Sequence, residues 1–84
     1  MDTRPINILL VEDNREYASV VQEMLARVMD IPYKFKHAER LATGLKYLET
    51  NGTDVVLLDL GLPDSKGLDT FFKVYDNTPK VPII

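Results

Sequence analysis

The chain contains the run Val55-Val56-Leu57-Leu58-Asp59-Leu60-Gly61-Leu62-Pro63, and this run decides the fold class. Its first four residues are all apolar, without alternating polar side chains, which is typical of a strand buried on both faces. Such strands occur in parallel sheets that are covered by helices. Asp59 is therefore expected where the strand leaves the core.

A second apolar run, Ile8-Leu9-Leu10-Val11, ends in the same way and is followed by Glu12 and Asp13. In an open α/β sheet, ligands bind outside the carboxyl ends of the strands. Because neighbouring strands lie only about 4.8 Å apart, acidic side chains at two adjacent strand ends can share one ligand. Three carboxylates at one sheet edge therefore predict a divalent cation with oxygen ligands.

This pattern resembles the receiver domain of two-component response regulators. That family has an acidic pair after its first strand and a phosphate-accepting aspartate after its third. Glu12 and Asp13 match the pair, and Asp59 matches the phosphoacceptor. Pro63 and Gly67 lie four and eight residues after Asp59 and match the family's Asp-x-x-x-Pro-x-x-x-Gly loop.

The resemblance implies a Mg²⁺ site, with Mn²⁺ possible, and a phosphoryl-transfer reaction. Asp13 and Asp59 would bind the metal directly, the backbone carbonyl of Gly61 would add an oxygen, and Glu12 would act through a water. Asp59 would accept the phosphoryl group while the metal neutralises charge. The donor would be a phosphohistidine on a sensor histidine kinase or a phosphotransfer protein. Such a chain is a signalling receiver in a phosphorelay rather than an enzyme, although it assists its own phosphorylation and dephosphorylation.

Composition excludes several classes of function. The 84 residues include no cysteine, which excludes disulfides, thiolate metal sites and cysteine nucleophiles. A net charge of −3 gives no general attraction to nucleic acid or to anionic membranes. The N-terminus lacks the apolar region of a signal peptide, and no segment approaches the roughly 20 apolar residues of a membrane span. We therefore expect a cytoplasmic protein that contacts neither nucleic acid nor membrane through this segment.

Strands and helices alternate along the chain. We expect strands at residues 6–11, 33–37, 54–60 and 81–84. Asn14 is expected to cap a first helix, a second helix spans residues 39–50, and a third ends at Thr78-Pro79. Apolar residues at helical spacing predict these inward-facing positions: Tyr17, Val20, Val21, Met24 and Val28 in the first helix, Leu41, Leu45 and Leu48 in the second, and Leu68, Phe71, Phe72 and Tyr75 in the third.

Alternation of strand and helix favours right-handed crossovers and a parallel sheet, so the fold class is α/β. The resemblance implies a flavodoxin-like doubly wound sheet in the order 2-1-3-4, lacking the last strand and its helices. The family's Ser or Thr after strand four and Lys after strand five have no counterpart here. We therefore expect residues 1–84 to be one partial receiver domain, from a longer regulator or a short form of one. The bare edge at residues 81–84 predicts self-association through that side.

Two alternatives remain open on the sequence alone. The first is a truncated, receiver-like assembly module that does not take part in phosphotransfer. The second is a Mg²⁺-dependent phosphohydrolase, which would want a further acid at position 61, where Gly61 stands, and a catalytic base. A dinucleotide-binding domain is disfavoured because no Gly-x-Gly-x-x-Gly follows the first strand. His37, the only histidine, is expected to have a structural or solvent role on an edge strand.

Overall fold

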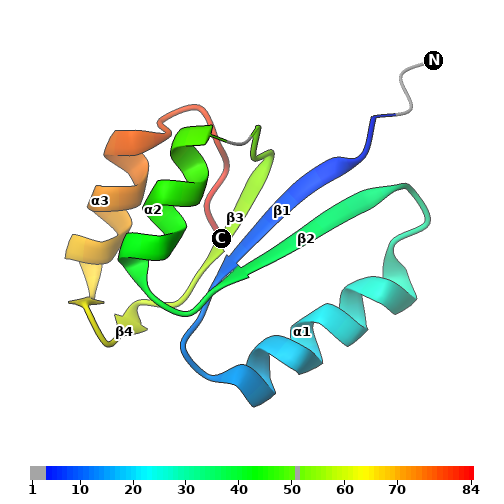
Figure 1. The fold of residues 1–84 in the computed structure, drawn as a ribbon, viewed down its shortest axis with the longest axis horizontal. Coiled ribbons are helices and arrows are strands. Elements are labelled where there is room, and N and C mark those ends of the chain that lie inside the picture. Colours follow the sequence, from blue (N-terminus) through cyan, green and yellow to red (C-terminus); the bar gives the residue numbers. More distant parts are fainter. Residues whose placement is uncertain (1–3, 51) are drawn as a thin grey trace.

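The computed structural model describes residues 4–50 and 52–84, which form a parallel three-stranded sheet with helices on both faces (Figure 1). The strands are β1 (Ile6–Val11), β2 (Tyr33–Ala38) and β3 (Val55–Leu58), in the order β2-β1-β3. The helices are α1 (Arg15–Val28), α2 (Leu41–Thr50) and α3 (Leu68–Asn77). The predicted α/β class and the predicted parallel pairing of the first three strands are confirmed.

The predicted fourth strand is present as a short pairing beside β3. Ile83 forms an isolated parallel bridge with Val56. The N–H of Val56 donates to the carbonyl of Pro82, and the N–H of Leu58 donates to the carbonyl of Ile84, both at 2.9 Å. Residues 81–84 therefore occupy the position next to β3 that the order 2-1-3-4 requires.

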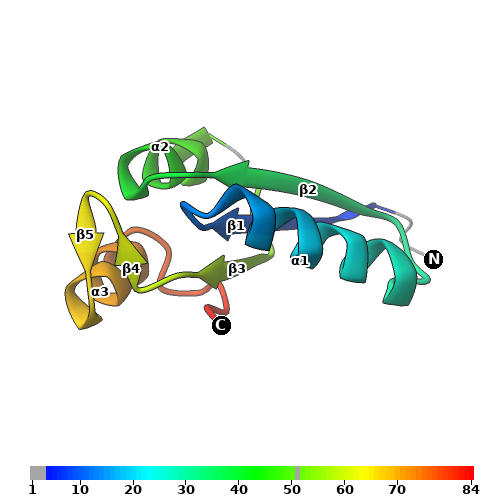
Figure 2. The same cartoon turned by 90° about the horizontal axis from the view of Figure 1, so that it is seen from below.

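A small hairpin follows β3 and was not predicted. The expected strand over residues 54–60 ends at Leu58, and β4 (Gly61–Leu62) then pairs with β5 (Ser65–Lys66) in antiparallel fashion. Gly67 closes the hairpin with a φ of 65°, which only glycine adopts without strain, and its N–H donates to the carbonyl of Leu60 at 2.6 Å. Figure 2 shows the hairpin beside α3 at the end of the sheet.

The core lies between the sheet, α2 and α3. Its buried members are Leu9, Val11, Ala38, Leu41, Leu48, Val56, Leu62 and Val74, with Leu45 packed against them. The predicted apolar stripe of the second helix is thus confirmed, although α2 begins at Leu41 rather than at residue 39. Fully burying one leucine or valine side chain stabilises a fold by about 1.5–3 kcal/mol, so this layer contributes strongly to the stability.

The predicted inner face of the first helix is largely wrong. Tyr17, Val20, Met24 and Val28 are 56, 51, 59 and 72% exposed, and the buried residue of α1 is Ala18. The helix is amphipathic, yet Val21 is the one residue of the predicted stripe that is half-buried. The predicted cap is confirmed, because the Asn14 side chain accepts from the N–H of Tyr17 at 3.0 Å.

The third helix also buries a different face from the predicted one. Thr70 and Val74 are fully buried, whereas Phe72 and Tyr75 are 54 and 45% exposed. Phe71 is half-buried and stacks on Tyr75, with ring centroids 5.9 Å apart. The Thr70 hydroxyl donates to the Ser65 hydroxyl at 2.7 Å, so the hairpin turns a polar position of α3 inward and leaves aromatic positions outside.

Candidate metal centre at the sheet edge

Three carboxylates meet at the carboxyl ends of β1 and β3. Glu12 and Asp13 directly follow β1, and Asp59 directly follows β3. Each of these residues offers one carboxylate oxygen within 4.8 Å of the other two. Because β1 and β3 are paired neighbours, Asp13 and Asp59 lie at one edge although they are far apart in sequence. The structure therefore brings together the three acids that the sequence analysis singled out.

Backbone hydrogen bonds hold both acidic segments after the strands have ended. The N–H of Glu12 donates to the carbonyl of Ala38 in β2, and the N–H of Asp59 donates to the carbonyl of Val11 in β1, both at 2.9 Å. These bonds extend the sheet ladder by one residue on each side. The backbone positions of Glu12 and Asp59 are therefore held by the sheet.

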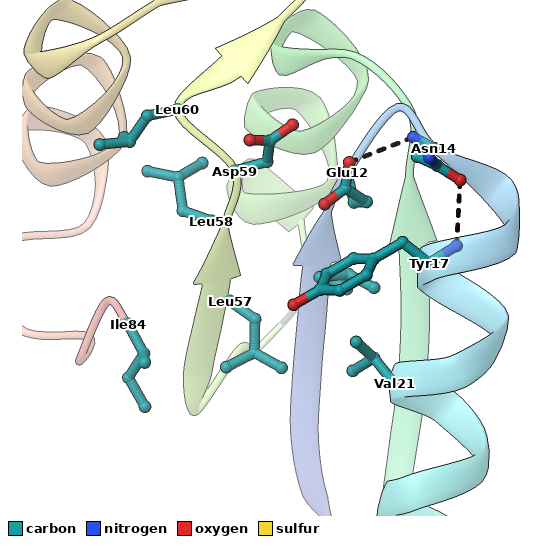
Figure 3. Close-up of a pocket in the computed structure, with 10 residues that line it drawn as sticks. Glu12, Asn14, Tyr17, Val21, Leu57, Leu58, Asp59, Leu60 and Ile84 are labelled. Carbon is teal, nitrogen blue, oxygen red and sulfur yellow. Dashed lines mark hydrogen bonds between the residues drawn. The ribbon is translucent and has the colours of Figure 1, made fainter.

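Glu12 is the buried member of the cluster, with 8% of its surface exposed. Burial raises the pKa of its carboxyl above the ordinary value, and the negative charge of Asp59 raises this pKa further. The backbone N–H of Asn14, 3.1 Å from Oε2, opposes the rise (Figure 3). Asp13 is exposed and Asp59 is half-buried. A cation at this edge would offset the repulsion that disfavours three ionised carboxylates.

Gly61 leaves one side of Asp59 uncovered. Its backbone N–H donates to Oδ1 of Asp59 at 3.0 Å, which fixes the direction of the carboxylate. A Cβ atom at position 61 would stand 3.6 Å from the same oxygen, so any side chain there would lie against Asp59. The predicted site residue Gly61 is therefore adjacent to the acidic cluster.

A cleft of about 540 Å³ begins at Glu12 and Asp59 and continues along the α1 face of the sheet (Figure 3). Its acidic end is polar, and its remaining walls are mostly apolar. The lining residues are Leu10, Glu12, Asn14, Tyr17, Val21, Leu57, Leu58, Asp59, Leu60 and Ile84. The acids therefore stand at the mouth of a groove rather than on a flat surface.

Two residues that the sequence analysis did not assign to the site make hydrogen bonds to segments beside it. Asp64 accepts hydrogen bonds from the N–H groups of Leu41 and Ala42, at 2.8 and 3.0 Å, and so ties the loop after Asp59 to the start of α2. His37 lies on the predicted edge strand, but its imidazole contacts the carbonyl of Glu12. Both contacts join residues more than 20 positions apart, so no local pattern signals them.

Comparison with known proteins agrees with the fold. The sequence model of the response regulator receiver domain matches residues 8–84, which is most of the chain. The chain belongs to this family. Receiver domains are signalling modules of two-component systems, and they bind Mg²⁺ at an acidic pocket. In this chain, Glu12, Asp13 and Asp59 form an acidic cluster.

Several curated proteins are similar to this chain. The transcriptional regulatory protein DltR of Streptococcus agalactiae serotype III is 35% identical over 79 residues, which cover 94% of this chain and 34% of DltR. The response regulator UvrY of Escherichia coli is 32% identical, over 94% of this chain and 36% of UvrY. A protein-glutamate methylesterase/protein-glutamine glutaminase of Paramagnetospirillum magneticum is 32% identical, over 96% of this chain and 22% of its own length. The chain thus spans about a third or less of these relatives.

Solved structures confirm the flavodoxin-like receiver fold. The MaeR response regulator bound to beryllium trifluoride has a TM-score of 0.83 and 26% identity, over 94% of this chain and 64% of that chain. The non-phosphorylated HemR receiver domain from Leptospira biflexa has a TM-score of 0.75 and 29% identity, over 95% and 61%. Among the helices described in residues 4–50 and 52–84, none has the length and apolar character that a membrane span needs.

Proposed function

We propose that this chain is a phosphoacceptor receiver, which takes a phosphoryl group from a phosphohistidine donor onto Asp59 with Mg²⁺ at the acidic cluster. The observation that supports the proposal is the convergence of Glu12, Asp13 and Asp59 within 4.8 Å at one sheet edge. The family of the chain and the groove beside Asp59 agree with it. A donor can approach Asp59 from the groove and from solvent.

The donor set fits a hard divalent cation. Mg²⁺ prefers carboxylate, carbonyl and water oxygens and keeps several waters, so a few protein ligands suffice. Asp13 and Asp59 would bind directly, the carbonyl of Gly61 would add one oxygen, and Glu12 would act through a water. Mn²⁺ suits the same ligands. When bound, the metal neutralises negative charge that would otherwise repel a phosphoryl donor.

A backbone hydrogen bond positions the nucleophile. The N–H of Gly61 holds Oδ1 of Asp59 and thereby orients the whole carboxylate. In the transfer, a carboxylate oxygen of Asp59 forms a bond to phosphorus while the phosphorus–nitrogen bond of the donor breaks. The leaving imidazole keeps the electron pair of that bond and takes up a proton. Asp59 then carries an acyl phosphate, and since position 61 has no side chain, we expect water to reach it readily.

The proposal extends to partners and location. The donor would be a sensor histidine kinase or a phosphotransfer protein. The chain would work in the cytoplasm as a signalling receiver and not as an enzyme. Two of the similar proteins are named a transcriptional regulatory protein and a response regulator, and one is named a methylesterase. The output of a whole protein that contains this segment is therefore a separate question from the acceptor chemistry.

We also propose self-association through the side formed by residues 81–84 and α1. Ile84 is 78% exposed, and Tyr17, Val20 and Met24 of α1 are all more than half exposed. Within the described residues, no strand pairs with residues 81–84 on the side away from β3. A second copy that packs against this side would cover both the open sheet edge and the apolar stripe of α1.

Phosphorylation by a small donor such as acetyl phosphate tests the acceptor role. Intact mass is measured with Mg²⁺ and with a chelator, for the natural chain, for Asp59→Asn and for the matched control Asp76→Asn, which changes an exposed aspartate of α3. We expect a gain of one phosphoryl group that needs Mg²⁺, persists in the control and disappears in Asp59→Asn. Mapping the group to another residue would refute the assignment. Absence of uptake would favour the assembly module, and donor turnover without an adduct would favour the phosphohydrolase.

A further inference from the structure

His37 is the only histidine of the chain, and it lies next to the acidic cluster rather than in open solvent. It belongs to β2, opposite Leu10 of β1, and its side chain is half-buried on the sheet face that α1 covers. Its Nε2 atom is 2.6 Å from the carbonyl oxygen of Glu12. A carbonyl oxygen only accepts hydrogen bonds, so Nε2 carries the hydrogen and donates it.

This hydrogen bond continues the sheet at the place where its backbone ladder stops. The N–H of Glu12 still reaches the carbonyl of Ala38, the last residue of β2. Beyond Ala38 the chain turns toward α2, so the side chain of His37 takes the place of the next backbone donor. Both the N–H and the C=O of Glu12 are therefore held by β2, one through backbone and one through imidazole.

The carbonyl of Glu12 belongs to the peptide bond that joins Glu12 to Asp13. A peptide unit is planar, so holding its oxygen also fixes the N–H of Asp13 and the position of the Asp13 Cα atom. On the other side, the N–H of Asn14 donates to Oε2 of Glu12, and the Asn14 side chain accepts from the N–H of Tyr17. Asp13 is exposed to solvent, and it lies between two anchored peptide units.

We infer that His37 is a positioning residue for the acidic cluster, because its imidazole orients the Glu12–Asp13 peptide so that the Asp13 carboxylate faces Asp59. This inference rests on the proposed function, since its consequence is read at the metal site. Groups that hold metal ligands in place typically change metal affinity by about 10- to 100-fold when they are removed. The bond here goes to the ligand's backbone rather than to its carboxylate, so we expect the lower value, about 10-fold.

The test compares three variants of the chain for Mn²⁺ affinity and for melting temperature without metal. His37→Leu removes the donor at similar size. His37→Gln restores an N–H donor near the position of Nε2. Phe35→Leu lies two residues earlier on the same face of β2, so it serves as a control for a general loss of packing.

We expect His37→Leu to weaken Mn²⁺ binding by about 10-fold, His37→Gln to recover most of the affinity, and Phe35→Leu to lower the melting temperature without weakening binding. The ring-nitrogen NMR signals of the natural chain should show hydrogen on Nε2, and the Asp13 amide signal should move in His37→Leu more than in His37→Gln. If the natural chain binds Mn²⁺ and His37→Leu binds it equally well, this inference alone is overturned. The same holds if Phe35→Leu weakens Mn²⁺ binding as much as His37→Leu does. A natural chain that binds no Mn²⁺ would refute the proposed function and this inference together.

Discussion

Asp64 holds the start of α2, and its removal is expected to destabilise the fold. Its two carboxylate oxygens accept hydrogen bonds from the N–H groups of Leu41 and Ala42, at 2.8 and 3.0 Å. The first turn of α2 contains no acidic residue of its own. Asp64 therefore supplies the negative charge that favours the positive end of the helix dipole.

The size of the effect follows from the geometry. Losing a side chain that caps a helix costs about 0.5–2 kcal/mol. Asp64 is exposed, so water screens its charge, and we expect about 1 kcal/mol for Asp64→Ala. In a domain of this size, that loss lowers the melting temperature by about 4–8 °C. Asp64→Asn keeps one acceptor oxygen and should show roughly half of the loss.

The effect has a defined pH dependence. The hydrogen bonds from Ala42 and Leu41 lower the pKa of Asp64 in the folded chain. A lowered pKa means that the unfolded chain binds the proton more readily, so the stabilisation is fully present above the unfolded pKa of about 3.9. It is lost as the pH falls through the lower, folded pKa. The difference in unfolding free energy between the natural chain and Asp64→Asn should therefore be full at neutral pH and shrink in acid.

Thermal unfolding followed by circular dichroism measures this difference. Asp76→Ala is the matched control, because Asp76 is an exposed aspartate of α3. Equal melting temperatures for Asp64→Ala and Asp76→Ala at neutral pH would refute the reasoning. A difference that persisted undiminished in strong acid would show that the carboxylate charge is not its source.

Three further predictions concern the acidic edge and the apolar side. Mg²⁺ should raise the melting temperature of the natural chain and not that of Asp59→Asn, because a ligand that binds only the folded state stabilises it. An equal shift in both proteins would refute the proposed metal site. Glu12→Gln should stabilise the metal-free chain at neutral pH. The pKa of Glu12 is raised in the folded chain, so ionising this carboxyl costs stability as the pH rises above about 4.5. A lower melting temperature for Glu12→Gln would contradict this. Light scattering should show a dimer or larger assembly that Met24→Lys weakens, whereas a stable, cooperatively melting natural monomer at high concentration would exclude the proposed self-association.

The acidic site was predictable because it depends on strand topology. Two uninterrupted apolar runs identify parallel strands that are buried on both faces, and the carboxyl ends of parallel strands share one edge. Glu12, Asp13 and Asp59 therefore had to converge once the two strands were neighbours, and the structure brings them together. The cap at Asn14 was predictable for a similar reason, since it depends on residues within one turn.

The buried faces of α1 and α3 were not predictable from spacing. A helical period shows that a helix has an apolar stripe, but the neighbouring elements decide whether that stripe is covered. Met24 belongs to the predicted stripe of α1 and is nevertheless 59% exposed. In α3, the hairpin turns Thr70 inward and leaves Phe72 outside.

The sequence by itself determined the alternation of the three described helices with the strands of the parallel sheet, and the edge at which the acids stand, because these follow from local patterns and from the rules that connect strands. Only the tertiary structure decided how the acids are held. His37 meets the carbonyl of Glu12 across 25 positions, and Asp64 meets Leu41 across 23. Such hydrogen bonds depend on the direction of single side chains after the backbone has folded, and no spacing along the chain encodes that direction.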